Sequence, residues 1–259
     1  MKMLKLLLTS ALTGFPVLPL AWGQDRPPEA QPAPLPAEVI KRLIVEQPNP
    51  KSPALRLPNF SPDGQFLATA GDDYLIHIWD LPSGKELTPL RGHGDWISHL
   101  VFLPDGKTLA SSGGKTIRLW EVPTGKEIFV LNGPYWNFAC SPDGRILAMV
   151  DGKSISMLDL STKKDVAKIK SPEDGLWSLA FSPDGKVLAV GGQRGQVHLW
   201  DVAQGNEILQ FKAAEKRFLA IAWSPDGGRI ATATYGKNAY GVWDAATGKE
   251  LFRINEGGS

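Results

Sequence analysis

The sequence has little of the chemistry on which catalytic and metal sites depend. Its single cysteine, Cys140, excludes an intramolecular disulfide. Its four histidines, His77, His93, His99 and His198, show no metal-ligand spacing supported by nearby carboxylates. No serine lies in a nucleophile-elbow context, and no helix is expected after the glycine pairs that could otherwise cradle phosphate. The sequence therefore predicts no catalytic residue, no metal site and no cofactor.

A concentration of charge is missing as well. The 28 basic and 27 acidic side chains give a formal net charge of +1, and no basic run occurs. Binding to nucleic acid or to an acidic membrane surface requires a concentrated basic surface. We therefore expect no nucleic-acid partner. With 259 residues, 42% of them hydrophobic, the chain is long enough to bury a core without disulfides.

The N-terminal segment differs from the rest of the chain. Residues 1–23 combine two lysines with a mostly apolar stretch and a small-x-small site at 21–23, a pattern typical of a secretory signal. This pattern predicts an exported protein, periplasmic or extracellular, with no stable membrane insertion after cleavage. The alternative is an uncleaved membrane anchor, but the apolar run is short for a span and two prolines interrupt it.

Residues 24–53 predict a tether with a short apolar segment. The proline-rich part, residues 24–36, is expected to be stiff and solvated. Residues 38–46, EVIKRLIVE, return to apolar character and fit either a short helix or a strand. Their role stays open, since they either cover the edge of the last repeat or are a remnant of another repeat.

From residue 54 onward, three sequence marks recur five times in a fixed order. The first is the turn Ser-Pro-Asp-Gly, or once Leu-Pro-Asp-Gly, at spacings of 42, 38, 41 and 42 residues, beginning at Ser61, Leu103, Ser141, Ser182 and Ser224. The second is a Trp-Asp pair or a weaker copy of it, beginning at Trp79, Trp120, Leu158, Trp200 and Trp243. The third is a turn of the type Thr-Gly-Lys-Glu. A period of about 40 residues is typical of a propeller array.

Each repeat predicts four short antiparallel strands. An alternating first strand ends at the Pro-Asp-Gly turn, where proline and glycine preset the turn geometry. A second strand rich in Ala, Ser and Gly suits close packing between sheets, and the third strand ends at the tryptophan. The predicted fold is an all-β propeller of five four-stranded antiparallel blades, at about 54–92, 93–133, 134–172, 173–214 and 215–259. The blades either close into a small ring or form part of a larger ring.

These marks together resemble the WD-repeat β-propeller family, in the form found in bacterial secreted proteins, over roughly residues 54–256. The resemblance implies structural roles for the mark tryptophans Trp79, Trp120, Trp200 and Trp243. It also implies a buried hydrogen-bonded set of His, Ser or Thr, Trp and Asp, for which His93, Ser111 and Trp120 are the candidates. The turn at 114–115 supplies no Asp, so we expect an incomplete set and a greater reliance on apolar packing.

The tryptophans outside the marks are the best candidates for binding. Trp96 lies seven places before the first residue of its Leu-Pro-Asp-Gly turn, and Trp136 and Trp177 lie five before the first residue of their Ser-Pro-Asp-Gly turns. These positions predict one rim of the propeller, which in WD-repeat proteins is the usual docking face, and Arg217 and Arg56 occupy corresponding places. Aromatic and arginine anchors are typical of binding hot spots. The alternative is that these indoles wedge between blades as packing.

The sequence as a whole predicts a non-enzymatic scaffold that binds a protein or peptide on one rim. The alternatives are a propeller enzyme with an active site in its channel, and a fragment of a larger secreted multidomain protein. The partner's identity and the oligomeric state do not follow from the sequence.

Overall fold

The computed structural model describes residues 55–135, 137–170, 175–214, 218–234 and 240–254, without the side chains of 55, 56, 218, 219 and 254. The predicted signal and tether, including residues 38–46, lie outside these ranges. The described residues form twenty strands and no helix. None of them therefore belongs to a helix that is long and apolar enough to cross a membrane.

The twenty strands form five antiparallel sheets of four consecutive strands each. The first sheet consists of β1 (Leu55–Phe60), β2 (Phe66–Gly71), β3 (Ile76–Asp80) and β4 (Lys85–Glu86). The second consists of β5 (Ile97–Phe102), β6 (Thr108–Gly113), β7 (Thr116–Glu121) and β8 (Lys126–Asn132). The third consists of β9 (Asn137–Cys140), β10 (Ile146–Val150), β11 (Ser154–Asp159) and β12 (Lys164–Lys170). The fourth consists of β13 (Leu176–Phe181), β14 (Val187–Gly192), β15 (Gln196–Asp201) and β16 (Glu207–Lys212). The fifth consists of β17 (Phe218–Trp223), β18 (Arg229–Thr234), β19 (Tyr240–Asp244) and β20 (Glu250–Ile254).

The Ser-Pro-Asp-Gly turn closes the first hairpin of four sheets through the same hydrogen bonds. In the first sheet, Ser61 Oγ donates to Asp63 Oδ1 at 2.6 Å and accepts from the Phe66 amide at 2.9 Å. Gly64 takes the left-handed conformation with φ of 70°, which favours glycine. The second sheet has Leu103 instead of the serine, and Asp105 bonds the Thr108 amide and hydroxyl there. The turn is thus specified locally by the repeated residues.

The hydrophobic core lies between consecutive sheets. The second to fifth sheets pack the face that carries the mark tryptophan, or Leu158 in the third sheet, against the sheet before them. The first to fourth sheets pack the opposite face against the sheet after them. Between the first two sheets, Trp120 and Leu109 pack with Ala68 and Ile78, all of which are at most 2% exposed. The alternation of apolar residues along each strand therefore fills both faces of an inner blade.

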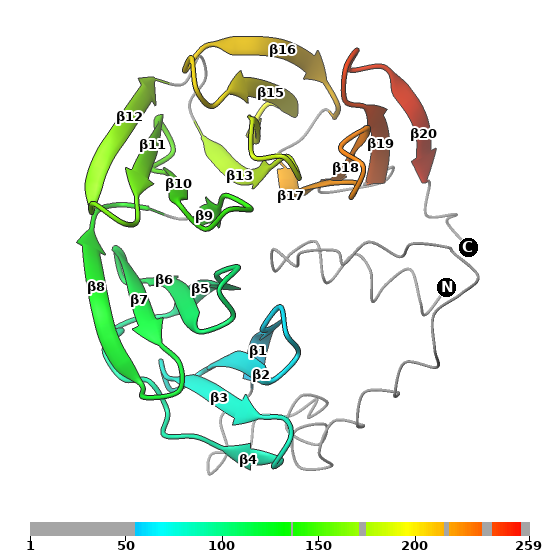
Figure 1. Cartoon of the computed structure of the whole chain (residues 1–259). Coiled ribbons are helices and arrows are strands. Elements are labelled where there is room, and N and C mark those ends of the chain that lie inside the picture. Colours follow the sequence, from blue (N-terminus) through cyan, green and yellow to red (C-terminus); the bar gives the residue numbers. More distant parts are fainter. Residues whose placement is uncertain (1–54, 136, 171–174, 215–217, 235–239, 255–259) are drawn as a thin grey trace.

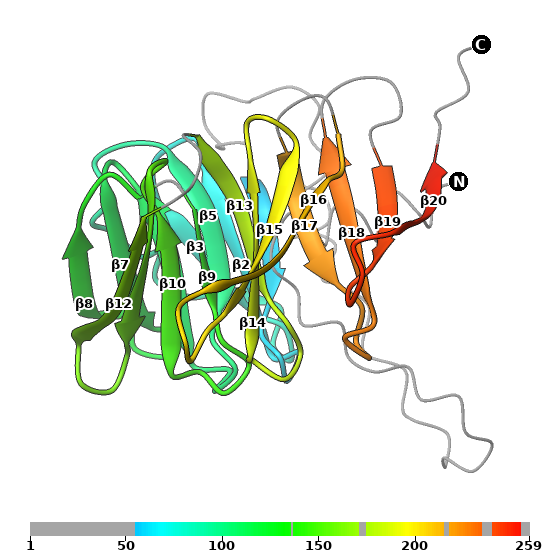
Figure 2. The same cartoon turned by 90° about the horizontal axis from the view of Figure 1, so that it is seen from above.

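The five sheets stand around a centre as the blades of a propeller, with each first strand innermost and each fourth strand outermost (Figure 1). Extensive contacts join consecutive sheets through their first strands: β1 with β5, β5 with β9, β9 with β13 and β13 with β17. This arrangement confirms the predicted all-β fold of five four-stranded blades. The side view in Figure 2 shows the sheets standing side by side with the fifth at one end of the row.

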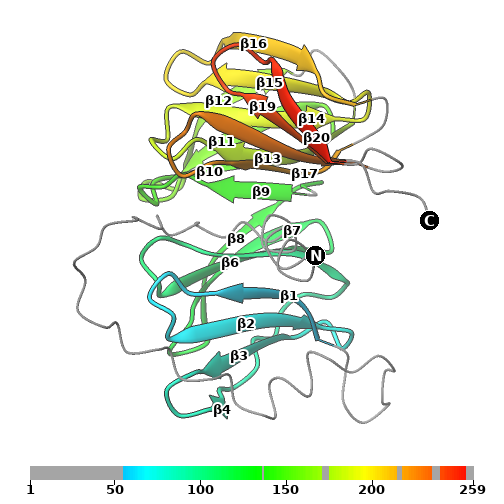
Figure 3. The ribbon, with the colours of Figure 1, turned by 90° about the vertical axis from the view of Figure 1, so that its right-hand side faces the viewer.

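The described residues form an open arc of blades. The sheet β17–β20 and the sheet β1–β4 stand at the two ends of the arc and are not packed on each other, as the view on to the open side shows (Figure 3). Of the two arrangements that the sequence leaves open, the described residues do not show the small closed ring.

Candidate functional site

The rim at which each first strand begins carries two exposed indoles. Trp96 immediately precedes β5 and is 45% exposed, and Trp177 lies in β13 and is 36% exposed. Their neighbours Ile97 and Leu176 are buried. At both places the chain therefore turns a large aromatic side chain outward beside a residue that anchors the strand in the core.

A β-bulge turns Trp177 outward. Leu176 pairs with Gly192 and Ser178 pairs with Gly191, so Trp177 is the extra residue between them. A bulge of this kind changes the direction of a side chain without ending the strand. From the third sheet, Asn137 Nδ2 donates a hydrogen bond of 3.0 Å to the Trp177 carbonyl oxygen, which holds the bulge to the neighbouring blade.

Trp177 borders a hollow of about 290 Å³ between the third and fourth sheets. The hollow is lined by Asp151, Gly152, Lys153, Gly175, Leu176, Trp177 and Gln193. The two turns that frame it are in direct contact, because the Gly175 amide donates to the Gly152 carbonyl oxygen at 2.6 Å. Enclosed small-molecule sites usually measure about 300–1,000 Å³. This hollow lies just below that range.

Trp96 borders a smaller hollow, of about 90 Å³, in the equivalent place between the first and second sheets. Its lining consists of Leu57, Ala70, Gly71, Asp72, Trp96, Ile97 and Ser98. In both hollows, one wall includes the end of the second strand or the turn after it in one blade, and the other wall includes the start of the next blade. Leu57 of β1 completes the smaller hollow, and Gln193, which follows β14, completes the larger one. The rim therefore repeats one design, an indole beside a hollow between two blades, at positions two blades apart.

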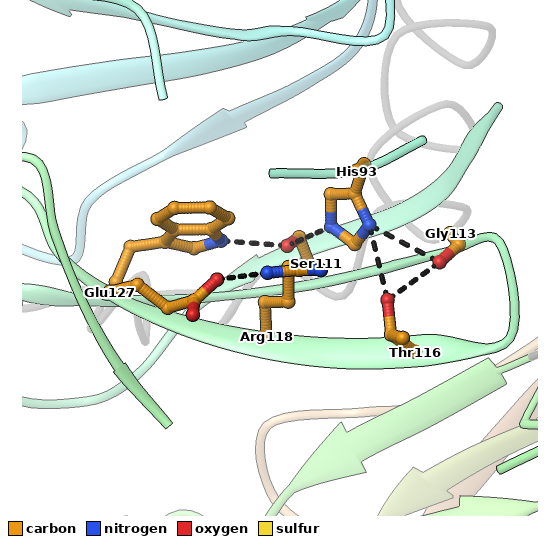
Figure 4. A network of polar contacts seen from close by, with 7 residues as sticks. His93, Ser111, Gly113, Thr116, Arg118 and Glu127 are labelled. Carbon is orange, nitrogen blue, oxygen red and sulfur yellow. Dashed lines mark hydrogen bonds and ion pairs between the residues drawn. The ribbon is translucent and has the colours of Figure 1, made fainter. Parts of the chain in front are cut away.

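A buried polar network lies directly beneath Trp96. His93 Nε2 and Ser111 Oγ are 2.7 Å apart, and Trp120 Nε1 donates to Ser111 Oγ at 2.8 Å. On the other side of the ring, His93 Nδ1 lies 3.2 Å from the Gly113 carbonyl oxygen. Figure 4 shows His93 held between Ser111 and the backbone at Gly113. One consistent pattern follows: Nδ1–H donates to Gly113, the Ser111 hydroxyl donates to Nε2, and the indole donates to Ser111.

This network requires a neutral imidazole at His93. Burial is the largest cause that lowers the pKa of His93, the nearby Arg118 guanidinium lowers it further, and the pKa reaches about 4. Arg118 itself forms an ion pair with Glu127 of the fourth strand. His93 is therefore uncharged at neutral pH and fits a buried structural role.

The same network fixes the segment from His93 to Trp96. A Cβ atom added at Gly113 would lie 2.8 Å from the Trp96 carbonyl oxygen and 3.1 Å from His93 Nδ1. Only glycine allows this close approach, since contacts shorter than 3.0 Å require something to move. The segment that presents the Trp96 indole is thus packed tightly on the end of β6.

The turn after β6 supplies partners that sequence reasoning missed. Where the resemblance implies an aspartate, Thr116 Oγ1 donates to the Gly113 carbonyl oxygen at 2.8 Å and lies 3.4 Å from His93 Nδ1. The carbonyl oxygen accepts from both groups. A backbone acceptor cannot be recognised from the sequence of side chains. The threonine directly after the Gly-Lys turn, however, indicated a side chain that could make this contact.

The other mark tryptophans differ in their partners. Trp243 Nε1 donates to Thr232 Oγ1 at 3.0 Å, so the fifth blade repeats the Trp120–Ser111 hydrogen bond. In the fourth blade, Val190 occupies the equivalent place, and among the described residues no acceptor lies within hydrogen-bonding distance of the buried Trp200 Nε1. Trp79 is buried at the first end of the arc.

A second repeated contact joins the third and fourth strands. His77 Nδ1 lies 2.5 Å from Glu86 Oε1, and His198 Nδ1 lies 2.8 Å from Glu207 Oε1. Arg118 and Glu127 form the corresponding pair in the second blade. The glutamate of the Gly-Lys-Glu type turn is therefore a structural partner of the third strand. Within the part of the chain that the structure describes, no group of three or more His, Cys, Asp or Glu residues could hold a metal ion.

The remaining predicted rim residues cannot be placed as side chains. Trp136 and Arg217 lie outside the described residues, and Arg56 lies in β1 with its side chain outside them. The structure thus places two of the five predicted rim residues on one rim. Trp96 lies one residue before β5, and Trp177 is the bulged residue of β13, the place that Ser98 takes in the second sheet.

Comparison with known proteins agrees with the geometry of the blades. Residues 54–80 and 84–121 match the family model described as WD domain, G-beta repeat, and residues 165–226 match the anaphase-promoting complex subunit 4 WD40 domain. The chain therefore contains WD40 repeats, which are typically scaffolds for protein interactions.

Individual relatives match over short stretches. The chain is 42% identical over 72 residues, 28% of its length, to the nuclear distribution protein PAC1 of Mycosarcoma maydis. It is 55% identical over 38 residues, 15% of its length, to the probable serine/threonine-protein kinase PkwA of Thermomonospora curvata. It is 41% identical over 68 residues, 23% of its length, to the human apoptotic protease-activating factor 1. These stretches span 15%, 5% and 5% of the respective relatives.

Proposed function

We propose that this chain is a non-enzymatic scaffold that docks a protein or peptide on the rim carrying Trp96 and Trp177. The observation that supports the proposal most directly is the repeated pairing of an exposed indole with a hollow between two blades. Trp136, Arg56 and Arg217 belong to the same proposed rim by their places in the repeat. WD40 repeats are the kind of module in which such a role is expected.

The physical basis is a set of rigid anchors on a stable frame. Aromatic anchors contribute most to affinity when they lie on a preorganised surface and lose little freedom on binding. The Trp177 backbone is bonded to the neighbouring blade, and the segment carrying Trp96 is packed on Gly113. The mark tryptophans that pack within the blades are at most 7% exposed, whereas Trp96 and Trp177 are 45% and 36% exposed.

The test compares three forms of residues 24–259 as bait in an extract of the source organism's cell envelope. The first is unchanged, the second carries Trp96→Ala and Trp177→Ala, and the control carries Val166→Ala and Ile208→Ala. The control removes exposed apolar side chains from the outer strands β12 and β16, away from the rim. We expect a partner that the first and third baits capture and the second loses.

The unfolding free energies of the three forms decide how a loss of capture is interpreted. Because both indoles are partly exposed, we expect each Trp→Ala change to cost about 1 kcal/mol, well below the roughly 3–5 kcal/mol of a buried tryptophan. A double variant that unfolds would show that the indoles are packing. Equal capture by the second and third baits would show that the rim is not the docking face.

We also propose that the protein is exported and acts in the periplasm or outside the cell. Residues 1–23 support this proposal through their charged start, apolar stretch and cleavage site. The protein isolated from cells should then begin at Gln24, as determined by mass spectrometry of its N-terminal peptide. An intact N-terminus in the cytoplasmic fraction would contradict the proposal.

A further inference from the structure

Among the described residues, no sheet lies against one face of the last blade. In β18 and β19, Ala231 pairs with Val242, and Val242 pairs with Phe252 of β20, so these three side chains share a face. The opposite face carries Trp243 and Ile230, which pack against the fourth sheet. We call this surface, which carries Ala231, Tyr240, Val242 and Phe252, the terminal face.

The equivalent positions in the other blades show how exposed this face is when another blade covers it. The residues equivalent to Val242, namely Ile78, Leu119, Met157 and Leu199, are at most 2% exposed because the next blade covers them. The residues equivalent to Tyr240, namely Ile76, Ile117, Ile155 and Val197, are at most 1% exposed. On the terminal face, Val242 and Tyr240 are partly exposed and Phe252 is 51% exposed. The third-strand positions that are core in four blades are thus partly open in the fifth.

The outward faces of the first and fifth sheets differ in how much of their apolar surface is exposed. On the first sheet, Leu67 and Trp79 lie on the face that points away from the second sheet, and they are 0% and 3% exposed. A second copy packed head to tail would bring this face, whose Leu67 and Trp79 show almost no exposed surface, against the terminal face. The open apolar surface is therefore confined to the fifth blade, which borders the open side of the arc (Figure 3).

We propose that residues 38–46 of the same chain cover the terminal face. This segment, EVIKRLIVE, is the apolar stretch closest to the first blade in the part of the chain that precedes it. As a strand it would carry Val39, Leu43 and Val45 on one side and Ile40 and Ile44 on the other. Apolar side chains on both sides suit a segment that lies against a sheet at a gap between blades.

The connection to the first blade is short, which favours an intramolecular occupant. Eight residues, 47–54, separate the segment from β1, and eight extended residues span up to about 28 Å. The first sheet stands across the open side of the arc from the fifth (Figures 1 and 3). A short tether gives an effective concentration in the millimolar range, far above that of a second copy at micromolar protein. This proposal concerns the last blade and is independent of docking on the rim.

The experiment measures how fast a thiol on the terminal face reacts with a labelling reagent. The full chain carries Cys140→Ser together with Phe252→Cys, and the matched control carries Cys140→Ser together with Ile208→Cys. Ile208 is 50% exposed on β16, so its surroundings offer a reference for an uncovered apolar position. We expect the thiol at position 252 to react at least tenfold more slowly than the thiol at position 208.

Changes in residues 38–46 then identify the cover. Ile40→Asp with Leu43→Asp should restore fast labelling at position 252, whereas Lys41→Gln with Arg42→Gln should leave it slow. Dilution should not change the rates. Labelling as fast as in the control would overturn the proposal. Protection that persists in the Asp variant, or that disappears on dilution, would also overturn it and assign the face to another occupant or to a second copy.

Discussion

Removing one hydroxyl group, that of Ser111, should destabilise the protein more than an ordinary serine substitution. Ser111 is 0% exposed and lies between two buried groups, His93 Nε2 at 2.7 Å and Trp120 Nε1 at 2.8 Å. Ser111→Ala deletes both hydrogen bonds and creates almost no space. The indole then keeps a buried donor without an acceptor, and the imidazole keeps a buried acceptor without a donor.

The magnitude follows from the cost of leaving buried polar groups unsatisfied. Each such group costs about 1–3 kcal/mol. The methyl group that replaces the hydroxyl recovers only a small part of this, so we expect a loss of about 2–4 kcal/mol. Domains of this kind are stable by about 5–15 kcal/mol, and the loss should therefore shift a urea unfolding midpoint clearly.

The assay is urea unfolding of four proteins that form a double-mutant cycle: unchanged, Ser111→Ala, Trp120→Phe and the double variant. Trp120→Phe removes the indole donor, so Ser111→Ala should cost less in that background, with a coupling of about 1 kcal/mol or more. A loss below about 1 kcal/mol for Ser111→Ala would refute the reasoning. Strict additivity in the cycle would also refute it, because the hydroxyl and the indole would then not interact.

Three further predictions concern buried groups. Burial lowers the pKa of His93 and His99 from the ordinary 6.5 to about 4. As the pH falls from 6.5 to 4, these two histidines therefore bind protons in the unfolded chain but not in the folded chain. Stability should therefore decrease in that window, by up to about 3 kcal/mol per histidine, and urea midpoints that stay constant from pH 7 to 4 would contradict this. Burial, with Asp143 and Asp105 nearby, raises the pKa of Cys140 to about 12, so its thiol should react with a labelling reagent at pH 8 only in the unfolded protein. Rapid labelling of the folded chain would contradict the assignment. Val190→Thr offers an acceptor to Trp200 Nε1, as Thr232 does for its indole, and should raise the unfolding free energy by about 1 kcal/mol. A decrease in that free energy would show that the new hydroxyl does not reach the indole.

The fold could be predicted from the sequence because its determinants are local. Proline, aspartate and glycine in each Pro-Asp-Gly turn set the geometry of the first hairpin, and a slip of one residue would expose every core side chain. The small residues Ala110 and Ala68 on the second strands indicated that the sheets pack closely, as the structure shows. Five copies of the same pattern predicted five blades.

The rim could be predicted only in part. The spacing of Trp96 and Trp177 from their turns placed both near the start of a first strand. That Trp177 is the extra residue of a bulge depends on the pairing of β13 with β14, which a single strand does not encode. The same holds for the Gly113 carbonyl oxygen, since a backbone acceptor becomes a partner of His93 only when two strands and a loop meet.

The sequence by itself determined the all-β class, the five blades and the tryptophans that mark them, because hairpin turns and alternating strands depend on residues close together in the chain. The tertiary structure alone decided that the five described blades form an open arc, in which no described sheet covers Val242 as the next blade covers Leu119 and Met157. Whether an array of blades closes depends on how side chains from successive sheets pack across their interfaces. That is a relation between residues about 40 positions apart, which no single repeat contains.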